Sequence, residues 1–440
     1  MSELEHQARD LLRRFPLIAG HNDLPWALRE RAGGDANKVR LSPPALGATE
    51  LPPPLGTTEL PPPLGATELP PAPAVTARPP GPAVTASPAG APDDPAEVNL
   101  ATPVAGLHTD LPRLAAGGVG AQFWSVYVPA SVAGDAAVTA VLEQIDLARR
   151  IVARYPEALE LALTADDVDR IFAAGRVASL LGAEGGHAIA GSLGVLRMLY
   201  ALGVRYLTLT HNANVGWADA ATDEPAAGGL TDFGRAVVRE MQRIGMLVDL
   251  SHVSPDTMRD SLDVAEAPVI FSHSSARAIC DAPRNVPDDV LARLAGNGGV
   301  CMVTFVPAFV SPECADWLAD LKVEAARRGL DPRNLGELFS FKSEWELTHP
   351  VPQATLAQVA DHVDHVRKVA GVEHVGLGGD FDGTDDVTVG LEDVSTYPAL
   401  FAELLARGWT ESDCAALAGG NLLRALRQAE SFARPSGPSS

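Results

Sequence analysis

Residues 246–273 read MLVDLSHVSPDTMRDSLDVAEAPVIFSH, and this stretch decides the fold. Two short apolar runs, residues 246–251 and 267–272, are each followed by a histidine, and between them Ser254 and Asp256 are well placed to start a helix. A strand, a helix and a second strand in this order form a unit whose two strands are parallel. Since parallel strands end at one edge of a sheet, we expect the two histidines to lie close together.

Eight apolar runs of this kind occur along the chain, and a helical pattern follows most of them. The clearest helical periodicity lies in residues 139–154, 192–202, 233–244 and 356–370. Alternating strands and helices are typical of parallel α/β proteins, and eight units favour a (β/α)8 barrel of the TIM type over an open doubly wound sheet, the main alternative. The eight runs are residues 16–20, 120–128, 177–183, 204–210, 246–251, 267–272, 299–305 and 374–379.

The composition limits the partners and the compartment. Hydrophobic residues make up 46% of the 440 residues, which is enough for a large buried core. Asp and Glu outnumber Lys and Arg by 56 to 34, and the net charge of −22 opposes binding to nucleic acid or to an anionic membrane. Because residues 1–20 lack the apolar core of a secretory signal, we predict a cytoplasmic protein without membrane attachment. Four cysteines are expected to be reduced packing residues: Cys280, Cys301, Cys314 and Cys414.

A proline-rich segment interrupts the pattern after the first run. In residues 41–95 the units LGATELPPP, LGTTELPPP and LGATELPPA follow one another, and 17 of the chain's 36 prolines fall in this segment. Such a composition favours solvated polyproline II over a packed core. We therefore predict one barrel domain over residues 1–440, with residues 41–95 as a low-complexity surface insertion and residues 429–440 as a flexible tail.

Titratable side chains follow six of the eight runs. In a barrel the carboxyl ends of the strands converge on one pocket, and catalytic groups come from several of these ends. Four of the chain's 11 histidines fall at such positions, which is hard to ascribe to chance. In chain order the converging residues are His21, Asp23, Glu184, His211, His252, His273 and Asp380.

The residue types in this group indicate a metal centre. Imidazoles and carboxylates without cysteine suit Zn²⁺ or Mn²⁺. His21 and Asp23, two apart in an extended segment, point to one side and can chelate one ion. His252 and His273 follow adjacent strands, about 4.8 Å apart, and can chelate a second ion, with Glu184 between the pairs as a bridge. Two such ions, about 3.5–4 Å apart, hold a hydroxide between them and stabilise a tetrahedral transition state.

Longer motifs around these residues resemble one known family, the membrane dipeptidases, also called renal dipeptidases. The resemblance covers about residues 12–428, except for the proline-rich segment and, less clearly, residues 307–353, a loop longer than its mammalian counterpart. The motifs are GHNDLP (20–25), GAEGGHAIAGSLGVLRMLYALGVRYLTLTHNANVGWAD (182–219), LVDLSHVS (247–254), PVIFSHSSA (268–276), RNVPDD (284–289) and GGDFDG (378–383).

The resemblance implies a barrel with two zinc ions that hydrolyses dipeptides and tolerates a D-residue at the carboxyl-terminal position. Matched position by position, it implies that His21, Asp23 and Glu184 bind one zinc. Glu184, His252 and His273 bind the other, so Glu184 bridges the two ions. The family also implies a homodimer.

The same resemblance implies roles for three further residues. His211, in TLTHN, is similar to the residue that polarises the substrate carbonyl. Arg284, in RNVPDD, is similar to the one that binds the substrate carboxylate, a role suited to the two-pronged guanidinium. Asp380, in GGDFDG, is similar to the residue that passes a proton to the leaving amine.

Two other functions stay open on the sequence. A different two-metal barrel hydrolase would act on cyclic amides, lactones or phosphotriesters, but many such sites use a bridging carboxylated lysine, and residues 183–185 read Ala-Glu-Gly. A catalytically silent barrel could bind a partner through the proline-rich segment, although ELPPPLG lacks flanking basic residues. The intact set of candidate ligands favours an enzyme.

The predictions for two histidines and two aromatic residues rest on weaker sequence signals. His362 and His365 are expected on a solvent-exposed helix face beside Asp361. Trp124 and Tyr127, near the end of the second run, are expected to pack in the core rather than to line the pocket.

Overall fold

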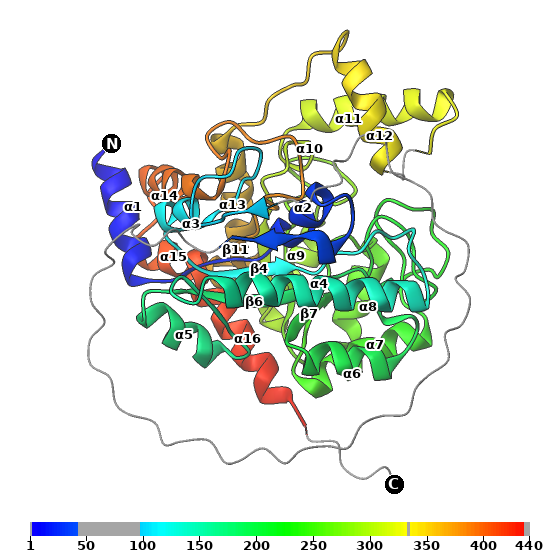
Figure 1. Cartoon of the computed structure of the whole chain (residues 1–440), viewed down its shortest axis with the longest axis horizontal. Coiled ribbons are helices and arrows are strands. Elements are labelled where there is room, and N and C mark those ends of the chain that lie inside the picture. Colours follow the sequence, from blue (N-terminus) through cyan, green and yellow to red (C-terminus); the bar gives the residue numbers. More distant parts are fainter. Residues whose placement is uncertain (1, 43–96, 332–334, 435–440) are drawn as a thin grey trace.

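Eight parallel strands form a closed barrel in the computed structural model, which describes residues 2–42, 97–331 and 335–434 (Figure 1). The strands follow one another around the ring in the order β1, β4, β6, β7, β8, β9, β10 and β11, and the pairing of β11 with β1 closes it. The predicted barrel is confirmed, and the open sheet is wrong. The strands are β1 (Leu17–Ala19), β4 (Val119–Ser125), β6 (Val177–Glu184), β7 (Val204–Thr208), β8 (Leu247–Asp249), β9 (Val269–Phe271), β10 (Val300–Val303) and β11 (Val375–Leu377).

Helices surround the barrel and cover its strands (Figure 1). The four periodic segments form α4 (Asp135–Arg154), α6 (Leu193–Ala201), α7 (Asp232–Ile244) and α13 (Leu356–Ala370). Ser254 starts α8 (Pro255–Val264) as predicted, since its hydroxyl accepts a hydrogen bond from the Thr257 amide. The other α-helices of the barrel layer and the termini are α1 (Glu3–Arg14), α2 (Leu24–Arg31), α3 (Leu111–Gly117), α5 (Ala165–Ala173), α9 (Asp288–Asn297), α14 (Tyr397–Ala406), α15 (Glu411–Ala415) and α16 (Asn421–Phe432).

The barrel interior is packed with side chains, as this architecture requires. One apolar cluster lies in the barrel interior, and a larger one fills the space between the strands and the helices. Almost every strand residue is buried on both faces, which explains why the strands read as continuous apolar runs rather than as alternating ones. The interior cluster includes Ile18, Phe123, Leu180, Tyr206, Leu247, Ile270 and Met302.

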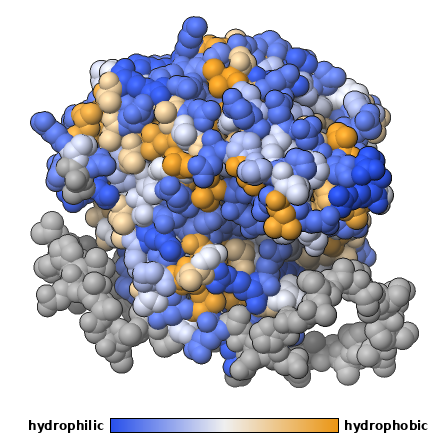
Figure 2. All heavy atoms as spheres, turned by 90° about the horizontal axis from the view of Figure 1, so that it is seen from above, coloured by the Kyte–Doolittle hydropathy of each residue, from blue (hydrophilic) through white to orange (hydrophobic). Residues whose placement is uncertain are grey.

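Residues 307–353 form a helical excursion with a small core of its own, rather than a plain loop. It contains α10 (Pro307–Val310), α11 (Pro312–Arg327) and α12 (Leu335–Glu346), and α11 and α12 project from the barrel in Figure 1. The Lys342 ammonium donates to both carboxylate oxygens of Asp386, each at 2.7 Å, and so ties α12 to the segment after β11. Figure 2 shows the molecule from this side as largely hydrophilic, with apolar residues in small separate groups.

A short pair of strands frames the proline-rich insertion. β2 (Arg40–Leu41) pairs with β3 (Glu97–Val98), while residues 43–96 lie outside the described part of the chain. Tyr155, at the end of α4, donates its hydroxyl to the Ser42 carbonyl at 3.1 Å and accepts from the Leu100 amide at 2.9 Å. The two ends of the insertion are therefore fastened to each other and to the barrel layer.

Replacing residues 45–92 by a short Gly/Ser linker is expected to leave the melting temperature nearly unchanged, and likewise kcat on the dipeptides that the family resemblance implies as substrates. β2 and β3 are parallel neighbours about 4.8 Å apart, so the linker has to cross this gap and run back past two-residue strands, which a short linker can do. For an insertion that does not pack, as the sequence predicts, shortening changes the closure free energy by roughly 2 kcal/mol or less, in the stabilising direction. A thermal melt and steady-state kinetics on a small and a bulky dipeptide would measure both effects. A large fall in melting temperature would mean that the insertion packs, and a changed bulky-to-small ratio would mean that it controls access.

Several smaller expectations can also be compared with the fold. β5 (Leu159–Leu161), which pairs with β6 outside the ring, was not predicted, because it is only partly buried and Glu160 interrupts the apolar run that marks the barrel strands. The tail expected from residue 429 begins too early, since α16 continues to Phe432. No helix in the described ranges is long and apolar enough to cross a membrane. All four cysteines are buried and free, as expected.

Candidate metal centre and active site

Six strand ends bring the seven predicted side chains together at one mouth of the barrel. His21 and Asp23 follow β1, and the others follow β6, β7, β8, β9 and β11. Asp23 does not continue an extended strand, because it occupies the residue before α2, where its side chain makes no capping hydrogen bond. Its carboxylate is thereby left to face the pocket. Three overlapping sets of side chains can each hold a metal ion: His21, Asp23 and Glu184; Glu184, His252 and His273; and His21, His273 and Asp380.

The two carboxylate oxygens of Glu184 face different pairs of ligands. Its Oε2 lies 3.4 Å from His21 Nε2, which is 3.2 Å from Asp23 Oδ2. Its Oε1 lies 3.0 Å from His252 Nε2 and 3.5 Å from His273 Nε2. These two ring nitrogens are 2.9 Å apart. Glu184 therefore stands between two half-sites, with one oxygen available to each.

Hydroxyl groups behind two of the histidines fix which ring nitrogen faces the centre. His21 Nδ1 lies 2.8 Å from the Tyr206 hydroxyl, which also donates to the Gly20 carbonyl. His273 Nδ1 lies 2.8 Å from the Ser272 hydroxyl, which donates to Asp249 Oδ2 at 2.6 Å. Each Nδ1–H can therefore donate outward, leaving the Nε2 lone pair for a metal.

The charges and the unpaired atoms of the cluster fit divalent cations. Burial lowers the pKa of both His252 and His273 well below the usual range, so these rings are neutral. Burial alone would raise the pKa of Glu184, but His21 and other neighbouring histidines hold it well below its usual range. Among the described residues, His21 Nε2 and Asp23 Oδ1 are buried without a hydrogen-bond partner. Burial alone would lower the pKa of His21, but Tyr206, Glu184 and Asp23 hold it well above the usual range, so the buried carboxylates draw positive charge to this ring. A metal ion can supply that charge instead.

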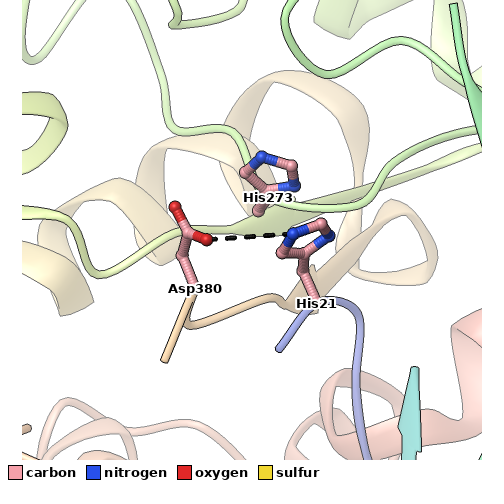
Figure 3. A group of neighbouring side chains, drawn as sticks. All are labelled: His21, His273 and Asp380. Atoms are coloured by element: carbon pink, nitrogen blue, oxygen red, sulfur yellow. Dashed lines mark ion pairs between the residues drawn. The ribbon is translucent and has the colours of Figure 1, made fainter. Parts of the chain in front are cut away.

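Asp380 extends from the segment after β11 over the same centre. Its Oδ1 lies 3.9 Å from His21 Nε2, and Figure 3 shows its carboxylate directed toward His21 beside the His273 ring. Burial, together with Asp23 and Glu184, raises the pKa of Asp380 to about 7. A carboxyl group with this pKa can both accept and release a proton near neutral pH.

The backbone at two of these residues is strained. His252 and Asp380 have φ values of 68° and 62°, in the left-handed region that favours glycine. Such positions cost about 1–3 kcal/mol each and persist where the surrounding structure enforces them. Gly383 is closely packed against two of the carboxylates. A Cβ at this position would lie 2.4 Å from Asp23 Oδ2 and 2.7 Å from Asp380 Oδ1. The final glycine of GGDFDG therefore makes room for both carboxylates.

His211 and Tyr127 form an aromatic wall next to the metal ligands. The His211 ring lies 4.4 Å from the His252 ring and 4.8 Å from the Tyr127 ring, measured between centroids. Burial lowers the pKa of His211 to about 4, so the imidazole is neutral and can donate one hydrogen bond. Tyr127 packs edge-on against Trp26 at 4.9 Å, and both Tyr127 and Trp124 are buried as expected, although Tyr127 also borders the site through His211.

Arg284 brings a buried positive charge close to the centre. Its guanidinium is 3% exposed and has only long contacts of 3.5 Å, to the Ser274 hydroxyl and to the His273 carbonyl. Burial lowers the pKa of Arg284 to about 10, so the group stays charged at neutral pH. Its Nε is buried without a hydrogen-bond partner within the described ranges. A carboxylate that enters the site would supply the partner that this guanidinium lacks.

A model of the membrane dipeptidase family, peptidase family M19, matches residues 86–440. The chain belongs to this family. It is 39% identical over 432 residues to dipeptidase 3 of Mus musculus, an alignment that covers 97% of the chain and 67% of the mouse protein. Membership in the membrane dipeptidases makes it a dipeptidase, and the family resemblance of its motifs is confirmed.

Solved structures agree with the dipeptidase fold. A probable dipeptidase from Pseudomonas aeruginosa superimposes with a TM-score of 0.67 at 25% identity, covering 74% of this chain and 90% of that one. A metallopeptidase from Rhodobacter sphaeroides, bound to a phosphinate mimic of L-Ala-D-Ala, gives 0.64 at 21% identity and covers 94% of this chain and 99% of that one. The latter likeness concerns the barrel alone.

Three other histidines lie outside the ligand cluster of this dipeptidase. His187 Nε2 donates to the Val128 carbonyl at 3.0 Å, and the residue is half-buried in the segment after β6. The exposed face expected for His362 and His365 was wrong. His362 is fully buried, and His365 lies 2.8 Å from Asp288 with little exposure. His362 follows Val359 by three residues, so it shares the apolar stripe of α13 rather than opposing it.

Proposed function

We propose that this dipeptidase hydrolyses its substrates at a centre of two zinc ions bridged by Glu184. The observation that carries the proposal is the division of the two Glu184 oxygens between separate ligand pairs. One ion would be held by His21, Asp23 and Glu184, and the other by Glu184, His252 and His273. Zinc held by these residues would activate a water molecule for attack and would polarise the scissile carbonyl.

The chain's own residues position the substrate and move the proton. Neutral His211 donates a hydrogen bond to the carbonyl oxygen, where negative charge develops. Asp380 accepts the proton of the attacking water and passes it to the amine of the leaving residue. Arg284 binds the free carboxylate of the substrate with its two-pronged guanidinium. The carboxylate contact sets the distance from the scissile bond to the chain end, which favours dipeptides.

Tolerance of a D-residue at the carboxyl-terminal position is part of the proposal. The Rhodobacter metallopeptidase, which shares the barrel, was solved with a mimic of L-Ala-D-Ala. A substrate held at its carbonyl by His211 and at its carboxylate by Arg284 presents either configuration at the carbon between them. The cytoplasmic location and the homodimer stay predictions.

Metal analysis and hydrolysis by the purified full chain test this function. We expect two zinc ions per chain, loss of activity on chelation and its recovery when zinc is restored. L-Ala-L-Ala and L-Ala-D-Ala should both be cleaved, and the corresponding tripeptides poorly. Full activity in a metal-free preparation would contradict the mechanism. A two-zinc protein that cleaves lactones or cyclic amides but no dipeptide would favour the alternative class of barrel hydrolase.

A further inference from the structure

An aromatic ring packs against the Arg284 guanidinium. The guanidinium carbon lies 5.2 Å from the centre of the Phe309 ring, a cation–π arrangement. Because its hydrogen bonds to the protein are long, packing on this ring has more influence on its direction than those bonds do. The position of Phe309 therefore decides where the substrate carboxylate can bind.

Phe309 belongs to α10, a helix that is too short to be stable without contacts to other elements. This single turn spans four residues, Pro307–Val310, at the start of the helical excursion. Two buried side chains bind its last carbonyls from outside. The Asn285 amide donates to the Phe309 carbonyl at 2.8 Å, and His362 Nε2 donates to the Val310 carbonyl at 3.0 Å.

The same two side chains also hold the loop that carries Arg284. His362 Nδ1 accepts from the Ala276 amide at 3.0 Å, and Asn285 Oδ1 accepts from the Ser275 amide at 3.1 Å. Both side chains are fully buried. Each one thus links α10 to the loop after β9, and the His362 link comes from a third element, α13.

We propose that His362 is a positioning residue for recognition of the substrate carboxylate. With its Nε2–H donating to α10 and its Nδ1 accepting from the loop after β9, it keeps the Phe309 ring against the Arg284 guanidinium. Asn285 supports the same contact from the other side of α10. This inference rests on the proposed role of Arg284 and adds residues that do not touch the substrate themselves.

The test compares a dipeptide with its carboxyl-terminal amide in three variants. His362→Leu removes both hydrogen bonds, Phe309→Leu removes the ring, and His362→Gln keeps one donor and one acceptor. We expect His362→Leu and Phe309→Leu each to lower kcat/KM for the dipeptide by roughly tenfold, mainly through KM, the size expected for losing one or two hydrogen bonds. The kcat/KM for the amide should change less than about twofold, zinc content should stay at the wild-type value, and His362→Gln should recover most of the loss.

A double-mutant cycle with Arg284→Ala separates positioning from general damage. If His362 acts through Arg284, adding His362→Leu or Phe309→Leu to Arg284→Ala costs no further activity on the dipeptide. Equal proportional losses on dipeptide and amide, or full additivity with Arg284→Ala, would overturn the inference and leave the dipeptidase proposal intact. Phe309 is only half-buried, so Phe309→Leu decides the matter even where His362→Leu does not fold. A wild-type protein that cleaves neither substrate would overturn the proposed function, and the inference with it.

Discussion

Glu184→Gln is expected to abolish dipeptide hydrolysis and to lower the zinc content together. A neutral amide cannot share negative charge between two cations, so their mutual repulsion at short range is no longer offset. The amide also presents hydrogens to one of the two ligand pairs, where the carboxylate presents a lone pair. We expect a loss larger than the roughly 10–100-fold that is typical for groups behind the ligands. Metal analysis and kcat on the same preparation would measure both effects.

Two matched variants make this result specific. Glu240→Gln changes the same charge in α7, away from the site, where the carboxylate pairs with Arg243, and should keep both zinc and kcat. Ser125→Ala removes the one hydroxyl that donates to Glu184 Oε2, at 3.2 Å, and should cost only a few-fold in kcat. Retention of two zinc ions and near-normal kcat in Glu184→Gln would show that this residue does not bridge.

The residues that line the centre could be predicted from the sequence because each strand end is marked there by the end of an apolar run. A side chain just beyond a parallel strand must lie at the barrel mouth, wherever its helix goes next. His252 and His273 follow this rule directly, and so does Glu184, two strands away from β1 in the ring. Their mutual distances, which depend on register and rotamers, required the structure.

The supporting groups were missed because they lie inside strands. Tyr206 reads as an ordinary core residue of β7, although its hydroxyl orients His21. Asp249, inside β8, did leave a signal: a carboxylate within an apolar run must find partners when buried, and it binds Thr208 and Ser272. Tracing such partners would have led to the hydroxyl behind His273.

The prediction for His362 was wrong for a different reason, because the sequence itself contained the spacing that contradicts it. Its spacing from Val359 and Val366 already places it on the apolar stripe of α13, and a buried histidine in such a stripe needs two hydrogen-bond partners. Those partners lie in loops far away in sequence, Ala276 and Val310, which no periodicity reveals. The excursion after β10 was likewise unpredictable in detail, since its core is local and small.

The second large effect is expected for Arg284→Ala, and it should depend on the substrate. Charge-assisted hydrogen bonds to a carboxylate contribute about 1.5–3 kcal/mol each, so kcat/KM for a free dipeptide should fall by more than about tenfold. The dipeptide amide, which offers the guanidinium no negative charge, should lose little. Arg284→Lys keeps the charge without the two-pronged geometry, so its kcat/KM for the free dipeptide should lie between the values of the wild type and of Arg284→Ala.

The comparison of the two substrates is what identifies the role of the arginine. The positive charge of Arg284 also helps to keep the pKa of His252 and of His211 low, after burial itself, so its removal could disturb the metal centre as well. Damage of that kind would slow the dipeptide and its amide by the same factor and would reduce the zinc content. A loss confined to the free carboxylate, with zinc unchanged, shows that the change acts on recognition of the carboxylate, and in Arg284→Ala the group removed is the one proposed to bind it. Equal losses on both substrates would refute this role.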